Sequence, residues 1–184
     1  VGLSVRELGI VAEGPAQHAR PVGVKSERLH QALAEHEVVV VPGFGAVRPN
    51  GRVALLGRGG SDLTAVVLAA ELGLKRVRLV KDVDGLYDRD PACETGTPLR
   101  YRRASWDTAR QVGGALVQHD AIDLAEARGV DIEVAALGRA EGTIVGERGA
   151  PPGPVQAAEP LKVAVAGCTC LLYTSDAADD LLCV

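Results

Sequence analysis

The segment Gly57–Asp62 combines three glycines with Arg58 and Asp62, and it runs into an apolar stretch that predicts a helix ending near Gly73. Ser61 is a good N-cap for that helix. Glycines let the backbone approach a ligand, and the N–H groups and positive dipole at a helix start favour an anion. The Arg58 guanidinium is suited to a carboxylate or a phosphate. The segment therefore predicts an anion site, although a tight strand-to-helix turn without a ligand explains the glycines equally well.

A second group of charged residues follows the predicted strand Arg76–Val80. Lys81–Pro91 brings a lysine and four aspartates to the carboxyl end of that strand, where ligands of open parallel sheets bind. Lys81 and Asp82 come directly after the strand and are the best placed for chemistry. Since Asp-Gly and Asp-Pro are common turn pairs, a solvated turn is the alternative.

The elements that must position these two segments alternate between helices and strands. Before the glycine-rich segment, Ser26 predicts the start of a helix that runs to about His36. The apolar run Val38–Val41, closed by Pro-Gly, is typical of a parallel strand buried on both faces. Arg48–Arg52 has the composition of a hairpin turn.

Two further helices and two strands are expected nearer the end of the chain. They are residues 105–112 with Ser105 as N-cap, 120–128 ending at Gly129, 131–137 and 142–145. This alternation of helices and strands predicts an α/β fold.

The composition excludes several classes of function. The chain has 184 residues, of which 47% are hydrophobic, enough for the core of one globular domain. Aromatic residues make only 3% and the net charge is −4, which argues against nucleic-acid binding. No uncharged apolar run approaches the roughly 20 residues of a membrane-spanning helix, and no signal peptide precedes Arg6, so we expect a cytoplasmic protein without membrane contact.

Cysteines and histidines give no metal site. Cys168, Cys170 and Cys183 lie close to the end of the chain and leave Cys93 alone, which supports neither a disulfide framework nor a paired zinc site. The four histidines are scattered, and no pair has ligand spacing with a carboxylate as third partner. No metal ligand is therefore assigned.

The chain changes character near residue 148. Residues 148–160 are rich in proline and predict a linker. Residues 161–168 are typical of the first strand of a dinucleotide-binding domain, but Thr169 stands where its second glycine is expected. Residues 169–184 are interpreted as a non-native tail, with a divergent helix as the alternative. The chain contains no methionine, so Val1 is not expected to be a natural start.

Three motifs in order carry a resemblance to a known family. Val40–Phe44, Leu56–Ala65 and Asp82–Pro91 resemble the amino-acid kinase family, and the aspartokinases in particular. The resemblance covers residues 1–147 and implies the later, nucleotide-binding part of a mostly parallel sheet sandwiched by helices. With the strand after the linker, the chain resembles the kinase part of a bifunctional aspartokinase and homoserine dehydrogenase, truncated at both ends.

The resemblance implies transfer of the ATP γ-phosphoryl group to the β-carboxylate of aspartate, with Mg²⁺, and NAD(P) for the dehydrogenase part. It assigns catalytic roles to Ser61 and Asp62. The residues implied to bind the substrate are Phe44, Arg58, Gly59 and Gly60. Those implied to meet the nucleotide are Lys81, Asp82 and Tyr87. The family also implies that the parent is a homo-oligomer.

Several positions depart from the family pattern. The Lys-x-Gly-Gly strand that opens the family's domain is missing before Val1, so the fragment itself is expected to be inactive. Lys81 replaces a usual threonine, Ala92 stands where arginine is common, and Ala115 replaces a usual lysine. Two cations that would face the ATP phosphates are therefore absent. A noncatalytic scaffold attached to the dehydrogenase is the main alternative, and acetylglutamate kinase, carbamate kinase and a free-standing NAD-binding protein fit the motifs less well.

Overall fold

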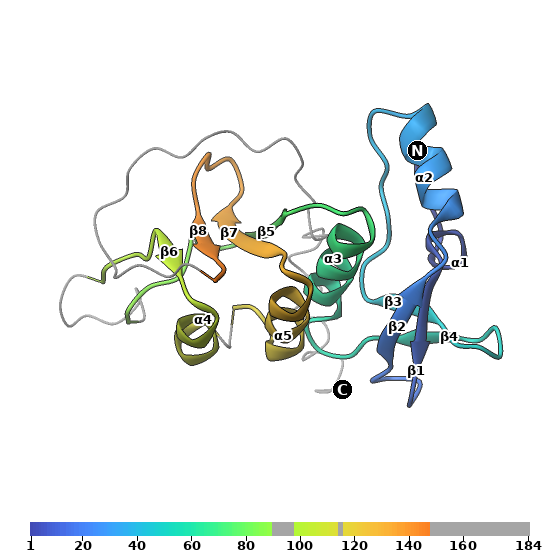
Figure 1. Cartoon of the computed structure of the whole chain (residues 1–184), viewed down its shortest axis with the longest axis horizontal. Helices are drawn as coiled ribbons and strands as arrows, with labels where there is room; N and C mark the ends of the chain where they lie inside the picture. The colour runs from blue at the N-terminus through green and yellow to red at the C-terminus, as the bar shows by residue number, and fades with distance from the viewer. Residues whose placement is uncertain (90–97, 114–115, 148–184) are drawn as a thin grey trace, which may run out of the picture.

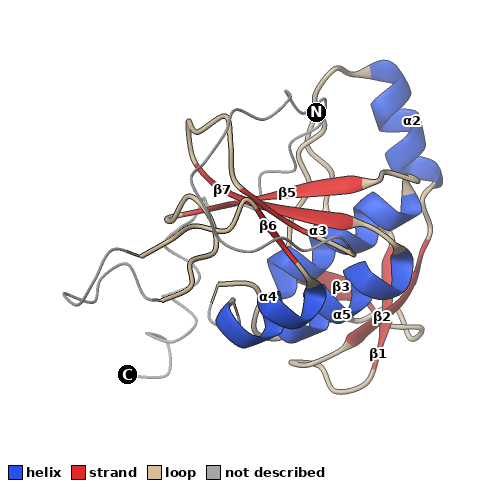
Figure 2. Ribbon diagram, turned by 60° about the vertical axis from the view of Figure 1, so that its left-hand side comes forward, coloured by secondary structure: helices blue, strands red, loops and turns tan. Residues whose placement is uncertain are grey.

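A long apolar helix, α3 (Gly60–Glu71), lies between two four-stranded sheets (Figures 1 and 2). The structure is a computed structural model that describes residues 1–89, 98–113 and 116–147. Helix α3 is buried along most of its length, because its apolar residues contact elements on several sides. It therefore forms the centre of the described core.

The first sheet has the strand order β2-β1-β3-β4. These strands are β1 (Ile10–Glu13), β2 (Arg20–Val24), β3 (Gly45–Val47) and β4 (Val53–Leu55). Strands β3 and β4 form the predicted hairpin, with Ala46 opposite Ala54, while β1 pairs antiparallel with β2 and parallel with β3. The short helix α1 (Val5–Leu8) packs on β3 and on helix α2 (Glu27–Glu35).

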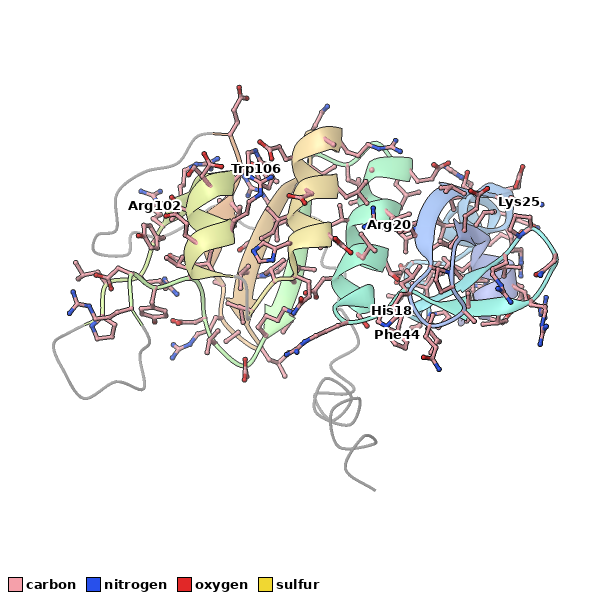
Figure 3. All side chains as sticks on the ribbon, turned by 90° about the horizontal axis from the view of Figure 1, so that it is seen from below. His18, Arg20, Lys25, Phe44, Arg102 and Trp106 are labelled. Atoms are coloured by element: carbon pink, nitrogen blue, oxygen red, sulfur yellow. The ribbon has the colours of Figure 1, made fainter. Side chains whose placement is uncertain are left out.

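The second sheet has the strand order β5-β7-β8-β6. These strands are β5 (Arg76–Lys81), β6 (Arg103–Ala104), β7 (Asp131–Ala136) and β8 (Thr143–Val145). Helix α5 (His119–Arg128) lies between α3 and helix α4 (Trp106–Val112) along this sheet (Figure 3). The α/β class is confirmed. The second sheet is mostly parallel, with β5–β7 and β6–β8 parallel and β7–β8 antiparallel, whereas the first sheet is mostly antiparallel, because β1–β2 and β3–β4 pair antiparallel.

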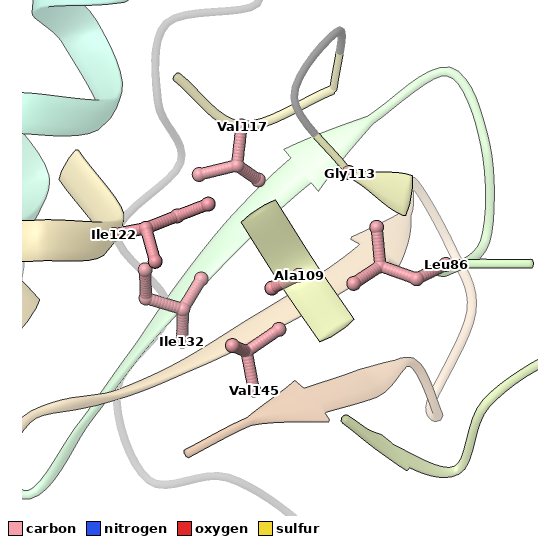
Figure 4. A pocket seen from close by; sticks show the side chains of 7 residues that line it. All are labelled: Leu86, Ala109, Gly113, Val117, Ile122, Ile132 and Val145. Carbon is pink, nitrogen blue, oxygen red and sulfur yellow. The ribbon is translucent and has the colours of Figure 1, made fainter. Parts of the chain in front are cut away.

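Helices α4 and α5 close an apolar interior over the second sheet. Figure 4 shows a small pocket there, which is lined by Leu86, Ala109, Gly113, Val117, Ile122, Ile132 and Val145. Each of the apolar side chains in this set is nearly inaccessible to solvent. This packing holds α4 and α5 against β7 and β8.

The N-terminal ends of the helices show which predicted N-caps hold locally and which are overridden by tertiary contacts. Ser105 caps α4 as predicted, with its hydroxyl accepting from the N–H of Thr108 at 3.2 Å. Ser61 is not the N-cap of α3, because the left-handed turn at Gly59 starts the helix earlier and places Ser61 inside its first turn. Ser26 precedes α2 but makes no capping hydrogen bond, since its hydroxyl donates to Glu71 at 2.7 Å.

The prediction of a strand buried on both faces at Val38–Val41 is wrong. Val40 makes an isolated parallel bridge to Gly2, and the side chains of Val38 and Val40 are 66% and 63% exposed. Val39 and Val41 pack against the core instead. Among the described residues, 1–3 pair with the edge of this segment, but no second layer packs on the face that carries Val38 and Val40.

Several predictions fall on residues outside the described ranges. They concern the linker at 148–160, the strand at 161–168, the tail at 169–184, and the positions of Asp90, Ala92 and Ala115. Among the described residues, no helix has both the length and the apolar character needed to cross a membrane.

Candidate active site

The glycine-rich segment turns the chain from β4 into α3. Gly57 and Gly59 have φ angles of 78° and 70°, a left-handed conformation that glycine adopts because it has no Cβ. The N–H of Gly60 donates to the carbonyl of Gly57 at 3.0 Å. Within the described residues, the N–H groups of Ser61 and Asp62 have no hydrogen-bond acceptor, as expected in the first turn of a helix. They are available to bind an anion.

Phe44 lies beside the first turn of α3 (Figure 3). Its φ of 73° is unusual for a residue with a side chain and requires support from its surroundings. The N–H of Phe44 donates to Thr64 Oγ1 at 3.1 Å, and that hydroxyl donates to the Gly60 carbonyl at 2.8 Å. A Cβ on Gly60 would lie 2.7 Å from the Phe44 ring. The close approach of ring and helix therefore requires glycine at position 60.

Asp62 and Lys81 form an ion pair between α3 and β5. Lys81 Nζ donates to both carboxylate oxygens of Asp62, at 2.9 and 2.8 Å. The two side chains are 9% and 22% exposed. Burial raises the pKa of the Asp62 carboxyl above its ordinary value, and the Lys81 ammonium offsets part of that increase. The pair holds an ammonium next to the helix start where an anion is favoured.

The remaining residues predicted on these two segments lie in different surroundings. Ser61 is partly buried, and a Cβ built on Gly43 would lie 2.9 Å from the Ser61 hydroxyl oxygen. Arg58 and Asp82 are exposed. The structure thus gathers six predicted residues around the start of α3: Phe44, Gly59, Gly60, Ser61, Asp62 and Lys81.

Tyr87 belongs to a second cluster, built around Asp84. The Tyr87 hydroxyl donates to Asp84 Oδ1 at 2.7 Å, and Arg100 Nη1 donates to Asp84 Oδ2 and to the Asp84 carbonyl, both at 2.8 Å. Burial and the contact with Asp84 raise the pKa of Tyr87. Because the hydroxyl is engaged, the ring face is the part of Tyr87 that remains for a ligand. Sequence reasoning gave no role to Arg100, since no motif surrounds it.

Two other side chains that carried no sequence assignment pack against the glycines. His18, in the loop between β1 and β2, lies where a Cβ on Gly57 would approach its Nδ1 to 2.6 Å. The side chain of Gln118, which immediately precedes α5, occupies the space that a Cβ on Gly59 would need. No sequence signal marks either residue, because both reach the segment only through tertiary packing.

The described residues contain no group of three or more histidine, cysteine, aspartate or glutamate side chains arranged to hold a metal ion. The candidate site therefore consists of a glycine turn, the N-terminus of a helix and one buried ion pair. Such a site is suited to an anionic ligand whose charge is balanced by backbone N–H groups and an ammonium.

The model of the amino acid kinase family matches residues 1–135. Because this match covers most of the chain, the chain belongs to the amino acid kinase family. Its relatives include aspartokinases. The aspartokinase of Bacillus sp. (strain MGA3) is 34% identical over 145 residues, which are 77% of this chain and 35% of that protein. The aspartokinase of Geobacillus stearothermophilus is 34% identical over 151 residues, which are 80% of this chain and 37% of that protein.

Solved aspartokinase structures have the same fold. Escherichia coli aspartokinase III in complex with aspartate and ADP, in its R-state, matches with a TM-score of 0.70 and 26% identity over 80% of this chain and 35% of that chain. The aspartate kinase of Synechocystis matches with a TM-score of 0.64 and 29% identity over 83% of this chain and 25% of that chain. The chain thus spans about a third of the length of the curated relatives.

Proposed function

We propose that the chain is part of an aspartokinase that transfers the γ-phosphoryl group of ATP to the β-carboxylate of L-aspartate. The product is 4-phospho-L-aspartate, the first intermediate toward threonine, methionine and lysine. The observation that carries the proposal is the Lys81–Asp62 ion pair beside the glycine turn at the start of α3. It provides a fixed positive charge next to backbone N–H groups that are open to an anion.

Phosphoryl transfer requires mainly positioning and neutralisation of charge. An aspartate carboxylate oxygen attacks the γ-phosphorus, the bond to the bridging oxygen breaks, and ADP leaves with that electron pair. In our assignment, Arg58 holds a substrate carboxylate with its guanidinium, and Phe44 with the two glycines shapes the pocket. The N–H groups of Ser61 and Asp62 face the anionic reacting centre.

Lys81 is assigned to the phosphate charge. An ammonium has three N–H donors, and the two oxygens of Asp62 engage two of them. The third donor is available to a phosphate oxygen. Asp62 is then an orienting residue that fixes the ammonium, because its carboxylate is held on the buried side of the pair.

Asp82 and Tyr87 complete the nucleotide side of the proposal. Mg²⁺ in phosphoryl-transfer sites is bound largely by substrate phosphates with one or two carboxylates, so it needs no dedicated cage of protein ligands. The exposed carboxylate of Asp82, directly after β5, fits that requirement. When bound, Mg²⁺ would neutralise charge on the phosphates. Tyr87 would offer its ring face to the nucleotide.

The residues after 147 extend the proposal to the parent protein. We infer a proline-rich linker at 148–160 and the beginning of an NAD(P)-binding homoserine dehydrogenase domain at 161–168, on sequence pattern alone. The parent would then be a bifunctional homo-oligomeric enzyme, and residues 169–184 would be a non-native tail.

A noncatalytic scaffold is the second candidate. Ala92 and Ala115 favour it, because both stand where the family pattern has a cation. A scaffold of this kind would retain the fold without binding ATP.

Calorimetric titration of MgATP into the 184-residue chain tests the choice, with circular dichroism to verify folding. The kinase proposal expects saturable binding that Lys81→Ala and Asp82→Ala both weaken about tenfold or more, since each removes a charge that faces the nucleotide. Lys75→Ala removes an exposed lysine just before β5 and should leave the affinity unchanged. A folded chain that takes no MgATP contradicts the assignment of these residues as sufficient to bind the nucleotide, and it favours the scaffold.

A further inference from the structure

The segment that follows β5 is tied to two distant parts of the chain. The N–H of Leu86 donates to Thr143 Oγ1 on β8 at 2.9 Å, and the N–H of Tyr101 donates to the Leu86 carbonyl at 2.8 Å. Tyr87 forms an isolated antiparallel bridge with Arg100. These contacts fix the backbone on both sides of Leu86, so the position of the Tyr87 Cα is set by the fold.

Arg100 is a buried arginine whose guanidinium contacts Asp84. Its side chain is 9% exposed, and its Nη1 donates both to the Asp84 carbonyl and to Asp84 Oδ2, each at 2.8 Å. A Cβ built on Gly85 would lie 2.9 Å from Arg100 Cδ, so the arginine stem lies close against the backbone next to Asp84. Because one nitrogen binds the main chain and the carboxylate of the same residue, the Asp84 side chain cannot rotate without losing a charged hydrogen bond.

Asp84 transmits this constraint to Tyr87. The Tyr87 hydroxyl donates to Asp84 Oδ1 at 2.7 Å, while Arg100 engages Oδ2. The two carboxylate oxygens therefore serve two different partners. The direction of the Tyr87 ring depends on the plane of the carboxylate, and that plane depends on Arg100. Since Tyr87 is only partly buried and its hydroxyl is engaged, a ligand would meet the face of a ring held at both ends.

Stability alone gives little reason for an arginine at position 100. Among the residues that the structure describes, its buried Nε has no hydrogen-bond partner. A buried N–H without a partner is costly, and replacing a buried ion pair by apolar side chains is often neutral or stabilising. The specific effect of Arg100 is the orientation of Asp84 and, through it, of Tyr87.

We infer that Arg100 is a positioning residue for the nucleotide, which through Asp84 holds the Tyr87 ring in the orientation in which a nucleobase stacks on it. Aromatic side chains bind bases in this way. The inference rests on the proposed function, because it takes the Tyr87 ring to face the nucleotide. It adds a residue that lies beyond the motif containing Asp84 and Tyr87 and that acts without touching the ligand.

Calorimetric titrations of MgATP and of magnesium tripolyphosphate into the 184-residue chain test this role, because tripolyphosphate carries phosphate charge but no base. Tyr87→Ala removes the ring and should weaken MgATP binding about tenfold, the effect of losing one stacked base. Arg100→Met removes the guanidinium and should weaken it about threefold, since the ring remains but is no longer oriented. Binding of tripolyphosphate should be unchanged in both variants.

A double-mutant cycle separates positioning from support of the fold. Once Tyr87→Ala is present, adding Arg100→Met should cause no further loss of MgATP affinity, because no ring is left to orient. Tyr87→Phe keeps the ring but frees it from Asp84, so it should weaken MgATP binding about as much as Arg100→Met does. Arg52→Met is the matched control, because Arg52 is an exposed arginine in the turn before β4, and it should leave the affinity unchanged.

Circular dichroism and thermal unfolding establish that each variant is folded. The inference is overturned if Arg100→Met binds MgATP as tightly as the unsubstituted chain, if its loss extends equally to tripolyphosphate, or if that loss persists in the Tyr87→Ala background. Should Arg100→Met fail to fold, undiminished MgATP affinity in Tyr87→Phe overturns the inference instead. If the unsubstituted chain binds no MgATP, the assignment of the nucleotide residues itself fails, and the inference fails with it.

Discussion

Lys81 at the end of β5 and Asp62 in the first turn of α3 are joined by two hydrogen bonds of 2.9 and 2.8 Å, which tie the second sheet to the central helix. Asp62 is buried. Removing Lys81 would leave a buried charge without its partner. We expect Lys81→Met to lower the free energy of unfolding by about 2 kcal/mol, below the usual 3–5 kcal/mol for a fully buried pair because Lys81 is partly exposed.

Urea unfolding of the Lys81→Met variant measures this loss. The double variant with Asp62→Asn should recover part of it, because the uncompensated carboxylate is then gone. A loss below about 0.5 kcal/mol would be typical of a surface pair and would contradict the buried character of this one.

The Gln118 side chain packs so closely on Gly59 that an alanine at position 59 should destabilise the fold more than an alanine at Gly73 does. Gly59→Ala introduces both a strained φ and a clash with the Gln118 side chain, whereas Gly73→Ala, with a φ of 67°, meets open space. We expect Gly59→Ala to be the more destabilising by at least about 1 kcal/mol, the order of an overpacking penalty. Thermal and urea unfolding compare them, and the excess should shrink when Gln118→Ala is added. Equal losses would contradict the contact.

Glu133 on β7 predicts a pH dependence of stability. The residue is 2% exposed and its Oε2 has no hydrogen-bond partner among the residues that the structure describes, while its other oxygen lies 3.3 Å from Arg78 Nη2. Burial raises the pKa of Glu133 above its ordinary value of 4.5, with Arg78 partly opposing. Because the folded-state pKa is the higher one, the stability that this group contributes is present below its unfolded pKa and is lost as pH rises through the folded one.

Comparing the free energy of unfolding of the unsubstituted chain with that of Glu133→Gln isolates this group from other titrating carboxyls. The unsubstituted chain should lose stability relative to the variant as pH rises from about 4 toward neutrality. If the unsubstituted chain instead gains stability relative to the variant over that interval, the direction of the pKa shift is contradicted.

Tyr87 offers a spectroscopic prediction. Burial, the hydrogen bond to Asp84 and the Asp84 charge all raise the pKa of the Tyr87 phenol. Asp84→Asn removes that charge, so the pKa of Tyr87 should fall toward its ordinary value of 10.0. Phenolate absorbance during an alkaline titration reports the change, and Tyr87→Phe identifies which transition belongs to this residue. An unchanged or higher pKa in Asp84→Asn would contradict the assignment.

The apolar interior under α4 and α5 predicts a large loss of stability when one of its side chains is shortened. Ile122 is 1% exposed and lines the small pocket with Ile132 and Val145 (Figure 4). Ile122→Ala should lower the free energy of unfolding by about 2–5 kcal/mol through lost burial and a new cavity. Leu137, which is 84% exposed after β7, gives the control Leu137→Ala with a change within about 0.5 kcal/mol. Similar changes for both would argue against this interior.

Local chemistry determined much of the secondary structure. The cap at Ser105, the hairpin between β3 and β4 and the left-handed stop at Gly129 all follow from neighbouring residues, and the structure has each of them. The three ordered motifs likewise predicted the family to which the chain belongs. These features are readable in sequence because a turn or a cap depends on a few adjacent side chains.

Tertiary contacts decided the rest. Val38–Val41 has the composition of a buried strand, but its exposure depends on which layers cover it, and composition does not specify them. Ser61 has the chemistry of an N-cap, yet the left-handed turn at Gly59 moved the helix start. The sequence alone supplied the types of residue in the site. Only packing between distant elements paired Lys81 with Asp62 and brought Gln118 onto the glycine turn, because such contacts require the whole fold.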